Sequence, residues 1–425
     1  MIPVYPSADE KAWKARLQRK AELDENVILS VKKIITDVRM RGDTALYEYT
    51  RKFDGADLAA TGLAVTSEEY EEAYKAVSKQ TLASLRRAAG NITAYHEKQR
   101  RESWEITTDG CRVGQMVRPI AKAGVYVPGG KASYPSSVLM NVLPAKIAGV
   151  KTILMATPPD RAGKISPLRL VAAKEAGADM VYKIGGAQAI AALAYGTENI
   201  PKVDKITGPG NAYVAAAKRE VFGQVGIDMI AGPSEILVIA DESADPVYIA
   251  ADMLSQAEHD ETAAAILVST SKETAERVIR EIVRQCGLLP KKDVAARSMQ
   301  DFGTAIICSD IAECAYVANA IAPEHLEILT EKPEGLLPLI ENAGAIFLGP
   351  YSPEPLGDYM AGPNHVLPTG GTARFSSPLG VDDFIKKTSL IQYTRDGLQQ
   401  VYEDIITLAR EEELEAHARS AGIRF

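Results

Sequence analysis

The chain of 425 residues has few cysteines, few histidines and no long apolar run. Its four cysteines, at positions 111, 286, 308 and 314, lie far apart without a C-x-x-C pair, which fits neither a disulfide framework nor a cysteine-ligated zinc site. No segment approaches the roughly 18 apolar residues that span a bilayer, and the charged start lacks the apolar core of a signal peptide. We therefore expect a cytoplasmic protein that is neither exported nor embedded in a membrane.

An excess of positive charge is also absent. The 48 Lys and Arg residues stand against 56 Asp and Glu residues, which gives a formal net charge of -8. Because a negative chain is repelled by the phosphate backbone, nucleic acid is not an expected partner. The composition, 46% hydrophobic and 24% charged, is typical of globular proteins, and the length exceeds that of a single core. Several domains are therefore expected.

The order of the predicted elements indicates an α/β fold. The first hundred residues have helical spacing, and Thr66 with Glu69 forms a capping-box pattern at the start of a segment that runs towards Arg100. From Ala123, short β-rich runs alternate with helical segments, which predicts βαβ units and two doubly wound layers with parallel sheets. The predicted strands are GVYVP, KTILMAT, DMVYKI, DKIT, EILVIAD, AAAILVST, TAIICS, HLEILT and GAIFLG.

The C-terminal part contains two further features. A glycine- and proline-rich stretch follows Gly349 and is too long for an ordinary connector, so we expect a functional loop. A final helix is predicted from about Leu398 to Ser420, with an apolar stripe along one face. That stripe needs a partner surface, and a second copy of the chain is one candidate.

Four residues form a candidate metal site. Asp245 and Pro246 supply the N-cap and first-turn proline of a helix whose end carries Gln256 and His259, three residues apart on one face. Both side chains can reach one ion, although a polar pair at a helix end can also merely cap it. Alone, Asp358 in the glycine-rich loop is equally a turn residue.

His417, near the end of the last helix, is the fourth candidate. A histidine at this position can also simply interact favourably with the helix dipole. Together, Gln256, His259, Asp358 and His417 form a nitrogen and oxygen donor set that suits Zn²⁺ or another divalent transition metal better than calcium or magnesium. They are spread over about 160 residues, so spacing alone does not establish that they converge.

Glu324 and His325 form a candidate proton-transfer pair. They stand side by side before an apolar strand, and the unperturbed pKa of an imidazole lies near the working pH of an enzyme. A surface loop with an incidental Glu-His pair is the alternative. His365, in GPNHVLP, is similarly ambiguous, and His96 is expected on a solvated helix face.

Four predicted βα junctions are rich in glycine: VPGG at 127–130, KIGGAQ at 183–188, TGPGNAY at 207–213 and AGPSE at 231–235. Glycine turns at the carboxyl ends of parallel strands bind phosphates and nucleotides in doubly wound folds. No segment completes the G-x-G-x-x-G fingerprint, because Tyr213 stands where the third glycine belongs. The glycines alone leave the cofactor undecided.

Seven motifs, in their order and spacing, resemble the histidinol dehydrogenase family over essentially the whole chain: GVYVPGG, KITGPGN, AGPSEILVIAD, LSQAEHD, APEHLEI, GDYMAGPNHVLPT and EAHARS. The resemblance implies a homodimer whose subunits have two incomplete Rossmann-like domains and small helical N- and C-terminal segments. We expect a helical arm at 1–25, a larger α/β domain of 26–122 plus 236–375, a Rossmann-like NAD-binding domain at 123–235, and a C-terminal segment at 376–425 that is swapped onto the partner subunit.

The resemblance also implies a reaction: oxidation of L-histidinol to L-histidine through L-histidinaldehyde, with reduction of two NAD, as the last step of histidine biosynthesis. His325 is expected to take the alcohol proton and Glu324 to activate water. The implied ligands of one Zn²⁺ per subunit are Gln256, His259, Asp358 and, from the partner subunit, the residue His417. These four residues are also implied substrate contacts, together with Ser234, His325, His365 and Glu412. The implied NAD contacts are Tyr126, Gln188 and Asn211.

Three other functions remain open. One is a family member that oxidises another amino or sulfonated alcohol, although Ser234, His365 and Glu412 favour histidinol. The second is a zinc-binding regulatory protein without catalysis, which the intact Glu324 and His325 disfavour. The third is a metallohydrolase, which would need no NAD loops.

Overall fold

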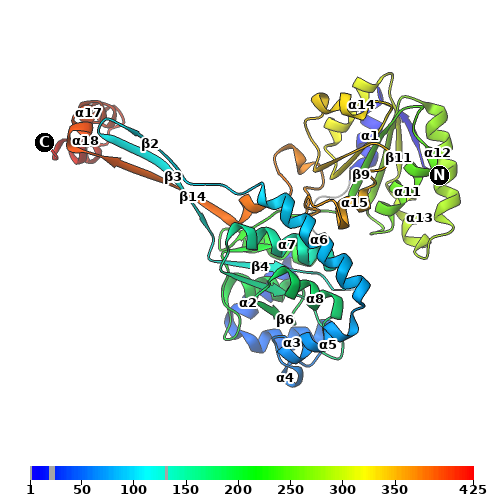
Figure 1. Cartoon of the computed structure of the whole chain (residues 1–425), viewed down its shortest axis with the longest axis horizontal. Coiled ribbons are helices and arrows are strands. Elements are labelled where there is room, and N and C mark those ends of the chain that lie inside the picture. Colours follow the sequence, from blue (N-terminus) through cyan, green and yellow to red (C-terminus); the bar gives the residue numbers. More distant parts are fainter. Residues whose placement is uncertain (1, 19–23, 130–132) are drawn as a thin grey trace.

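A computed structural model describes residues 2–18, 24–129 and 133–425, so Gly130 of the VPGG motif lies outside the described residues. Figure 1 shows two lobes, each built around a sheet, and a slender projection that carries the C-terminus away from both. Within the described ranges, no helix combines the length and apolar character needed to cross a bilayer.

The N-terminal end of the chain belongs to the lobe with the larger sheet. All of its strands run parallel, in the order β1 (Val4–Pro6), β11 (Thr304–Ile307), β10 (Ala264–Ser269), β9 (Glu235–Ala240), β12 (His325–Leu329) and β13 (Ala345–Leu348). The three central strands β10, β9 and β12 are buried along their whole length, which explains their nearly continuous apolar sequences. Apolar side chains of the flanking helices cover both faces: α11 (Pro246–Ala257), α12 (Lys272–Cys286) and α13 (Lys292–Asp301) on one, and α1 (Glu10–Leu17), α14 (Ile311–Ile321) and η1 (Pro333–Leu339) on the other.

The second lobe contains a parallel sheet of five strands. Their order is β6 (Met180–Tyr182), β5 (Thr152–Ala156), β4 (Lys122–Tyr126), β7 (Lys205–Thr207) and β8 (Gly226–Ile227). One face is covered by α5 (Ser67–Ala76), α6 (Lys79–Glu97), α7 (Pro135–Ala148) and α8 (Pro167–Ala176), and the other by α2 (Glu25–Arg41), α3 (Asp43–Phe53), α9 (Gly186–Tyr195) and α10 (Ala212–Val221). The α/β fold class with parallel sheets is confirmed. The predicted capping box of Thr66 and Glu69 opens α5, and the helical segment is interrupted before α6.

The N-terminal helices pack differently from the expected division. Residues 26–122 were grouped with 236–375, but buried side chains of α2 and α3, such as Val31 and Leu46, belong to the core that also contains Ile190 and Leu193 of α9. The apolar faces of α2 and α3 therefore complete the lobe with the five-stranded sheet. The first residues also differ from a helical arm, because β1 adds an edge strand to the six-stranded sheet.

The projection is an antiparallel sheet that the sequence did not predict. Its strand order is β14 (Ile385–Tyr393), β3 (Cys111–Pro119) and β2 (Trp104–Thr108), and β3 pairs with β14 over nine residues of each strand. Three helices follow at its tip, α16 (Arg395–Gln399), α17 (Tyr402–Glu411) and α18 (Glu415–Gly422). The prediction of one helix from Leu398 to Ser420 is wrong, because Glu413 adopts a left-handed φ of 60° and separates α17 from α18.

The packing of the N-terminal helices can be tested by truncating one buried leucine. Leu46→Ala removes a fully buried side chain of α3 and should lower the free energy of unfolding by about 2 to 5 kcal/mol. The matched control is Leu29→Ala on α2, where the leucine is 65% exposed and the change should stay within about 0.5 kcal/mol. Urea unfolding measures both. Similar small losses in both variants would contradict this packing.

Candidate functional site

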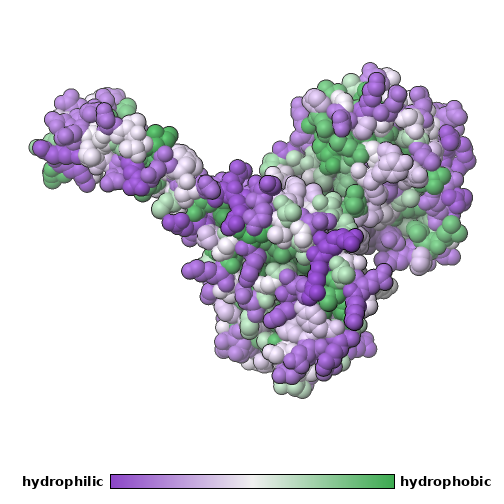
Figure 2. All heavy atoms as spheres, viewed as in Figure 1, coloured by the Kyte–Doolittle hydropathy of each residue, from purple (hydrophilic) through white to green (hydrophobic). Residues whose placement is uncertain are grey.

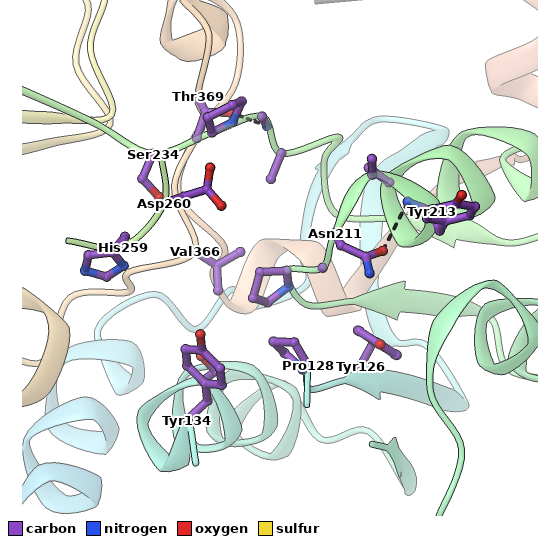
Figure 3. Close-up of a pocket in the computed structure, with 18 of the residues that line it drawn as sticks. Tyr126, Pro128, Tyr134, Asn211, Tyr213, Ser234, His259, Asp260, Val366 and Thr369 are labelled. Carbon is purple, nitrogen blue, oxygen red and sulfur yellow. Dashed lines mark hydrogen bonds between the residues drawn. The ribbon is translucent and has the colours of Figure 1, made fainter. Parts of the chain in front are cut away.

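A large cleft of about 2900 Å³ is lined by residues of both lobes. Figure 3 shows Tyr126, Pro128 and Tyr134 on one side of it and Ser234, His259 and Thr369 on the other. The five-stranded sheet contributes the residues at the carboxyl end of β4 and the loops that lead into α9 and α10, which is where doubly wound sheets bind ligands. Ten of the predicted site residues line this cleft: Tyr126, Gln188, Asn211, Ser234, Gln256, His259, Glu324, His325, Asp358 and His365.

His325 begins β12 and is buried beneath the cleft. Its Nδ1 donates a hydrogen bond to the carbonyl oxygen of Glu235 at 2.9 Å, so Nε2 carries the free lone pair. Burial lowers the pKa of His325 to about 4. The side chain is therefore a neutral imidazole near neutral pH, ready to accept a proton at Nε2.

Glu324 precedes β12 and contacts the same residue of the neighbouring strand. Its Oε2 accepts a hydrogen bond from the backbone N–H of Glu235 at 2.8 Å and lies 3.6 Å from Nδ1 of His325. Both side chains are buried, with 6% of Glu324 and 5% of His325 exposed. The interpretation of these two residues as an incidental surface pair is therefore wrong.

Asp358 lies on α15 (Glu354–Tyr359), in the glycine-rich segment after β13. Its Oδ1 is 3.2 Å from Nδ1 of His365. Burial acts to raise the pKa of Asp358, but the bond to His365 and the nearby imidazoles of His325 and His259 leave this pKa below its usual value. Asp358 is therefore a carboxylate surrounded by three imidazoles.

Glu354 is a site residue that the sequence analysis missed. Its Oε1 lies 3.7 Å from Nε2 of His325, and ligand atoms of Glu354, His325 and Asp358 lie within 4.8 Å of one another. Burial and the nearby Asp358 raise the pKa of Glu354 to about 8. A signal was present, because Glu354 and Asp358 are four residues apart and share one face of a helix.

Gln256 and His259 contribute two further donors. Helix α11 ends at Ala257, so His259 lies in the turn beyond it and does not share a helical face with Gln256 as predicted. The predicted N-cap Asp245 is confirmed. Gln256 is buried, and its Oε1 has no hydrogen-bond partner in the part of the chain that the structure describes. An orphaned amide oxygen beside a histidine and a carboxylate fits a divalent metal ion that accepts nitrogen and oxygen donors.

His417 and Glu412 lie outside the cleft of their own chain. Glu412 follows α17 and His417 is part of α18, both at the tip of the projection (Figure 1). Of the four predicted metal ligands, Gln256, His259 and Asp358 line the cleft of their own chain, whereas His417 does not.

His96 is buried, so the prediction of a solvated face is wrong. Its Nδ1 donates to the carbonyl oxygen of Ile92 at 3.0 Å, and its Nε2 lies 3.4 Å from the amide nitrogen of Asn364. Burial lowers the pKa of His96. Since Asn364 immediately precedes His365, the buried histidine supports the loop that carries His365.

A buried ion pair between Lys218 and Asp228 fixes the backbone of the loop after β7. Gly208 has a φ of +114°, and a Cβ there would collide with the carbonyl oxygen of Tyr126. Its N–H donates to Oδ2 of Asp228 at 2.8 Å, its carbonyl accepts from Nζ of Lys218 at 3.0 Å, and Lys218 pairs with Asp228. This contact holds the backbone that leads to Asn211, the N-cap of α10.

The opposite turn, at the start of α9, is fixed by Tyr126. The hydroxyl of Tyr126 accepts a hydrogen bond from the N–H of Gly186 at 3.0 Å, at the start of α9. Oε1 of Gln188 is buried and has no hydrogen-bond partner among the described residues. A ligand in this part of the cleft meets the N-termini of α9, which has no side-chain cap, and of α10, which Asn211 caps, and helix N-termini favour phosphate.

Comparisons with known proteins agree over the whole length of the chain. The family model described as histidinol dehydrogenase matches residues 17–425. The chain is 54% identical to a histidinol dehydrogenase of Heliobacterium mobile, over 99% of this chain and 98% of that protein, and 57% identical to one of Bacillus thuringiensis subsp. konkukian, over 95% and 94%. The crystal structure of histidinol dehydrogenase from Elizabethkingia anophelis is 40% identical and superimposes with a TM-score of 0.94, covering 100% of this chain and 98% of that one. The chain therefore belongs to the histidinol dehydrogenase family.

Proposed function

We propose that the chain oxidises L-histidinol to L-histidine in two successive steps, through L-histidinaldehyde, with reduction of two NAD. The observation that carries the proposal is a single cleft with a neutral imidazole and a carboxylate on one wall and glycine-rich nucleotide loops on the other. Among the described residues, none favours another alcohol, a metal protein without catalysis or a metallohydrolase.

NAD is proposed to lie across the carboxyl ends of the five-stranded sheet. Tyr126, Gln188 and Asn211 line this side of the cleft, and the N-termini of α9 and α10 open towards it. Helix N-termini stabilise the pyrophosphate, and the Gly208 turn lets the backbone approach closely. The nicotinamide then points towards the lobe with the six-stranded sheet, which carries His325.

Zn²⁺ is proposed to bind Gln256, His259 and Asp358, with His417 of the partner subunit as the fourth ligand. The orphaned Oε1 of Gln256 and the carboxylate of Asp358 support this assignment. When bound, the ion holds nitrogen atoms of the substrate and so orients the carbinol carbon towards the nicotinamide. Ser234, His365 and the partner's Glu412 are proposed to contact the substrate.

Proton transfer is assigned to the two buried residues that precede and begin β12. His325 accepts the alcohol proton at Nε2 while hydride leaves, because its Nδ1 is already engaged by the carbonyl of Glu235. Glu324 accepts a proton from the water that adds to the aldehyde, and the resulting hydrate is oxidised in the second step. Both hydride losses thus use His325, which returns its proton to the aldehyde oxygen as water adds, whereas Glu324 accepts the proton of that water.

A homodimer is proposed to complete the site. The projection presents large apolar side chains to solvent, including Trp104 at 54%, Ile391 at 73% and Leu408 at 65% exposure. Figure 2 shows hydrophobic residues interspersed among polar ones on this projection. A second copy of the chain that covers this surface can receive His417 and Glu412 in its own cleft.

The proposed reaction and its metal can be tested together. Purified protein with histidinol and NAD should form two NADH for each histidine produced. Removal of the metal with a chelator should abolish NADH formation, and added Zn²⁺ should restore it, because the proposed ion orients the substrate. Metal content and absorbance of NADH are the measurements. Full activity of a metal-free preparation would contradict the zinc assignment.

The division of roles between Glu324 and His325 predicts a selective defect. Glu324→Gln should slow conversion of histidinaldehyde to histidine by about 10² to 10⁴-fold, the usual contribution of one general base. Oxidation of histidinol to the aldehyde should change much less, because His325 is retained. Single-turnover reactions started from the alcohol and from added aldehyde separate the two steps. Equal losses in both would assign Glu324 to another role.

Shared sites predict complementation between inactive subunits. A mixture of His417→Ala and His259→Ala subunits should recover activity, because one cleft of each heterodimer has every ligand intact. A mixture of His259→Ala and Asp358→Ala subunits is the matched control, since each of its clefts keeps one defect. Activity after subunit exchange is measured for both mixtures. No recovery in the first mixture would place the whole site within one chain.

A further inference from the structure

Asp54 is a partly buried carboxylate in the cleft that the reaction steps above do not use. It is the C-cap residue of α3 and lines the same cleft as Tyr126 and Gln188. Its Oδ2 is buried and has no hydrogen-bond partner within residues 2–18, 24–129 and 133–425. Burial raises the pKa of Asp54 to about 6, so the group is still mostly ionised at neutral pH. An ionised acceptor of this kind requires a hydrogen-bond donor from a ligand or from solvent.

The surroundings of Asp54 define which ligand group it can accept. The described residues give it no ion pair, and the other buried orphan nearby in the cleft lining is Oε1 of Gln188, which is also an acceptor. Burial raises the pKa of Tyr126 to about 12, and the negative charge of Asp54 contributes to this increase. The immediate surroundings of the Asp54 carboxylate therefore favour neutral hydroxyl donors and disfavour a second anion.

The position of α3 indicates which half of the coenzyme reaches Asp54. Figure 1 shows α3 at the end of its lobe that is remote from the six-stranded sheet, whereas His325 begins β12 within that sheet. Since the nicotinamide must meet the substrate beside His325, the adenosine half extends towards α3. The vicinal hydroxyls of the adenosine ribose are the donor pair in this half, and a carboxylate binds them in many doubly wound dehydrogenases.

We propose that Asp54 binds the hydroxyls of the adenosine ribose of NAD and thereby excludes NADP. The proposal rests on the proposed NAD-dependent function. A phosphate at the 2′ position would remove one donor and place its negative charge against the partly buried carboxylate. In the Rossmann fingerprint the acidic residue follows the glycine motif, whereas here it comes from an N-terminal helix that packs on the sheet.

Asp54→Asn tests the proposal, because the amide keeps the shape of the side chain and removes its charge. We expect the KM for NAD to rise about tenfold or more, with kcat within about twofold, as for loss of one hydrogen bond to a charged group. The preference for NAD over NADP, as a ratio of kcat/KM values, should fall at least tenfold. Asp57→Asn is the matched control, since Asp57 pairs with Arg51 outside the cleft, and both quantities should be unchanged there.

Binding of ADP-ribose separates this proposal from the proposed function. ADP-ribose carries the adenosine half without nicotinamide, so calorimetric titration should give about tenfold weaker binding to Asp54→Asn than to the unchanged protein, whether or not turnover occurs. An unchanged dissociation constant for ADP-ribose, or an unchanged NAD to NADP ratio, would overturn the role of Asp54. Absence of NADH formation by the unchanged protein, with normal binding of ADP-ribose, would instead contradict the proposed reaction.

Discussion

The backbone of a single residue, Glu235, holds both side chains that are proposed to transfer protons, Glu324 and His325. Its N–H bonds Glu324 and its carbonyl bonds His325, and it begins the central strand β9. Because β9 pairs with β12 over its length, the position of both side chains is set by a buried parallel ladder rather than by a loop. The rotation of the imidazole and the identity of its free nitrogen both follow from this arrangement. The end of a rigid strand suits such a site, because it fixes the orientation of both side chains before any ligand binds.

The remaining parts of the cleft are held by similarly indirect contacts. Lys218 and Asp228 fix the Gly208 turn without facing the cleft as ligands, and the buried His96 supports the loop of His365 through Asn364. Lys218, Asp228 and His96, which are not proposed ligand contacts, thus fix the backbone that forms the walls of the cleft. The cleft lies between two separately packed lobes, so its shape depends on how these lobes face one another.

Local sequence patterns predicted the strands of both parallel sheets except the short edge strands β1 and β8, because buried strands are almost wholly apolar and are followed by glycine or capped helices. They did not predict the projection. Every residue of β2 is exposed, and β3 pairs with β14 from the far end of the chain, so neither strand has a buried face to mark it. Helical spacing located α2 and α3 but could not show which sheet their apolar faces cover. Nothing in the local sequence distinguishes Asp54 and Glu354 from other acidic residues. Only burial in the folded chain raises their pKa values.

The order of elements along the chain has a consequence for synthesis on the ribosome. All strands and helices of the two lobes precede Ile385, so both cores can form while the last residues are still in the exit tunnel. Until β14 emerges, β2 and β3 remain a two-stranded ribbon, which is only marginally stable in water. The projection is therefore completed only after every strand and helix of the two lobes has been synthesised.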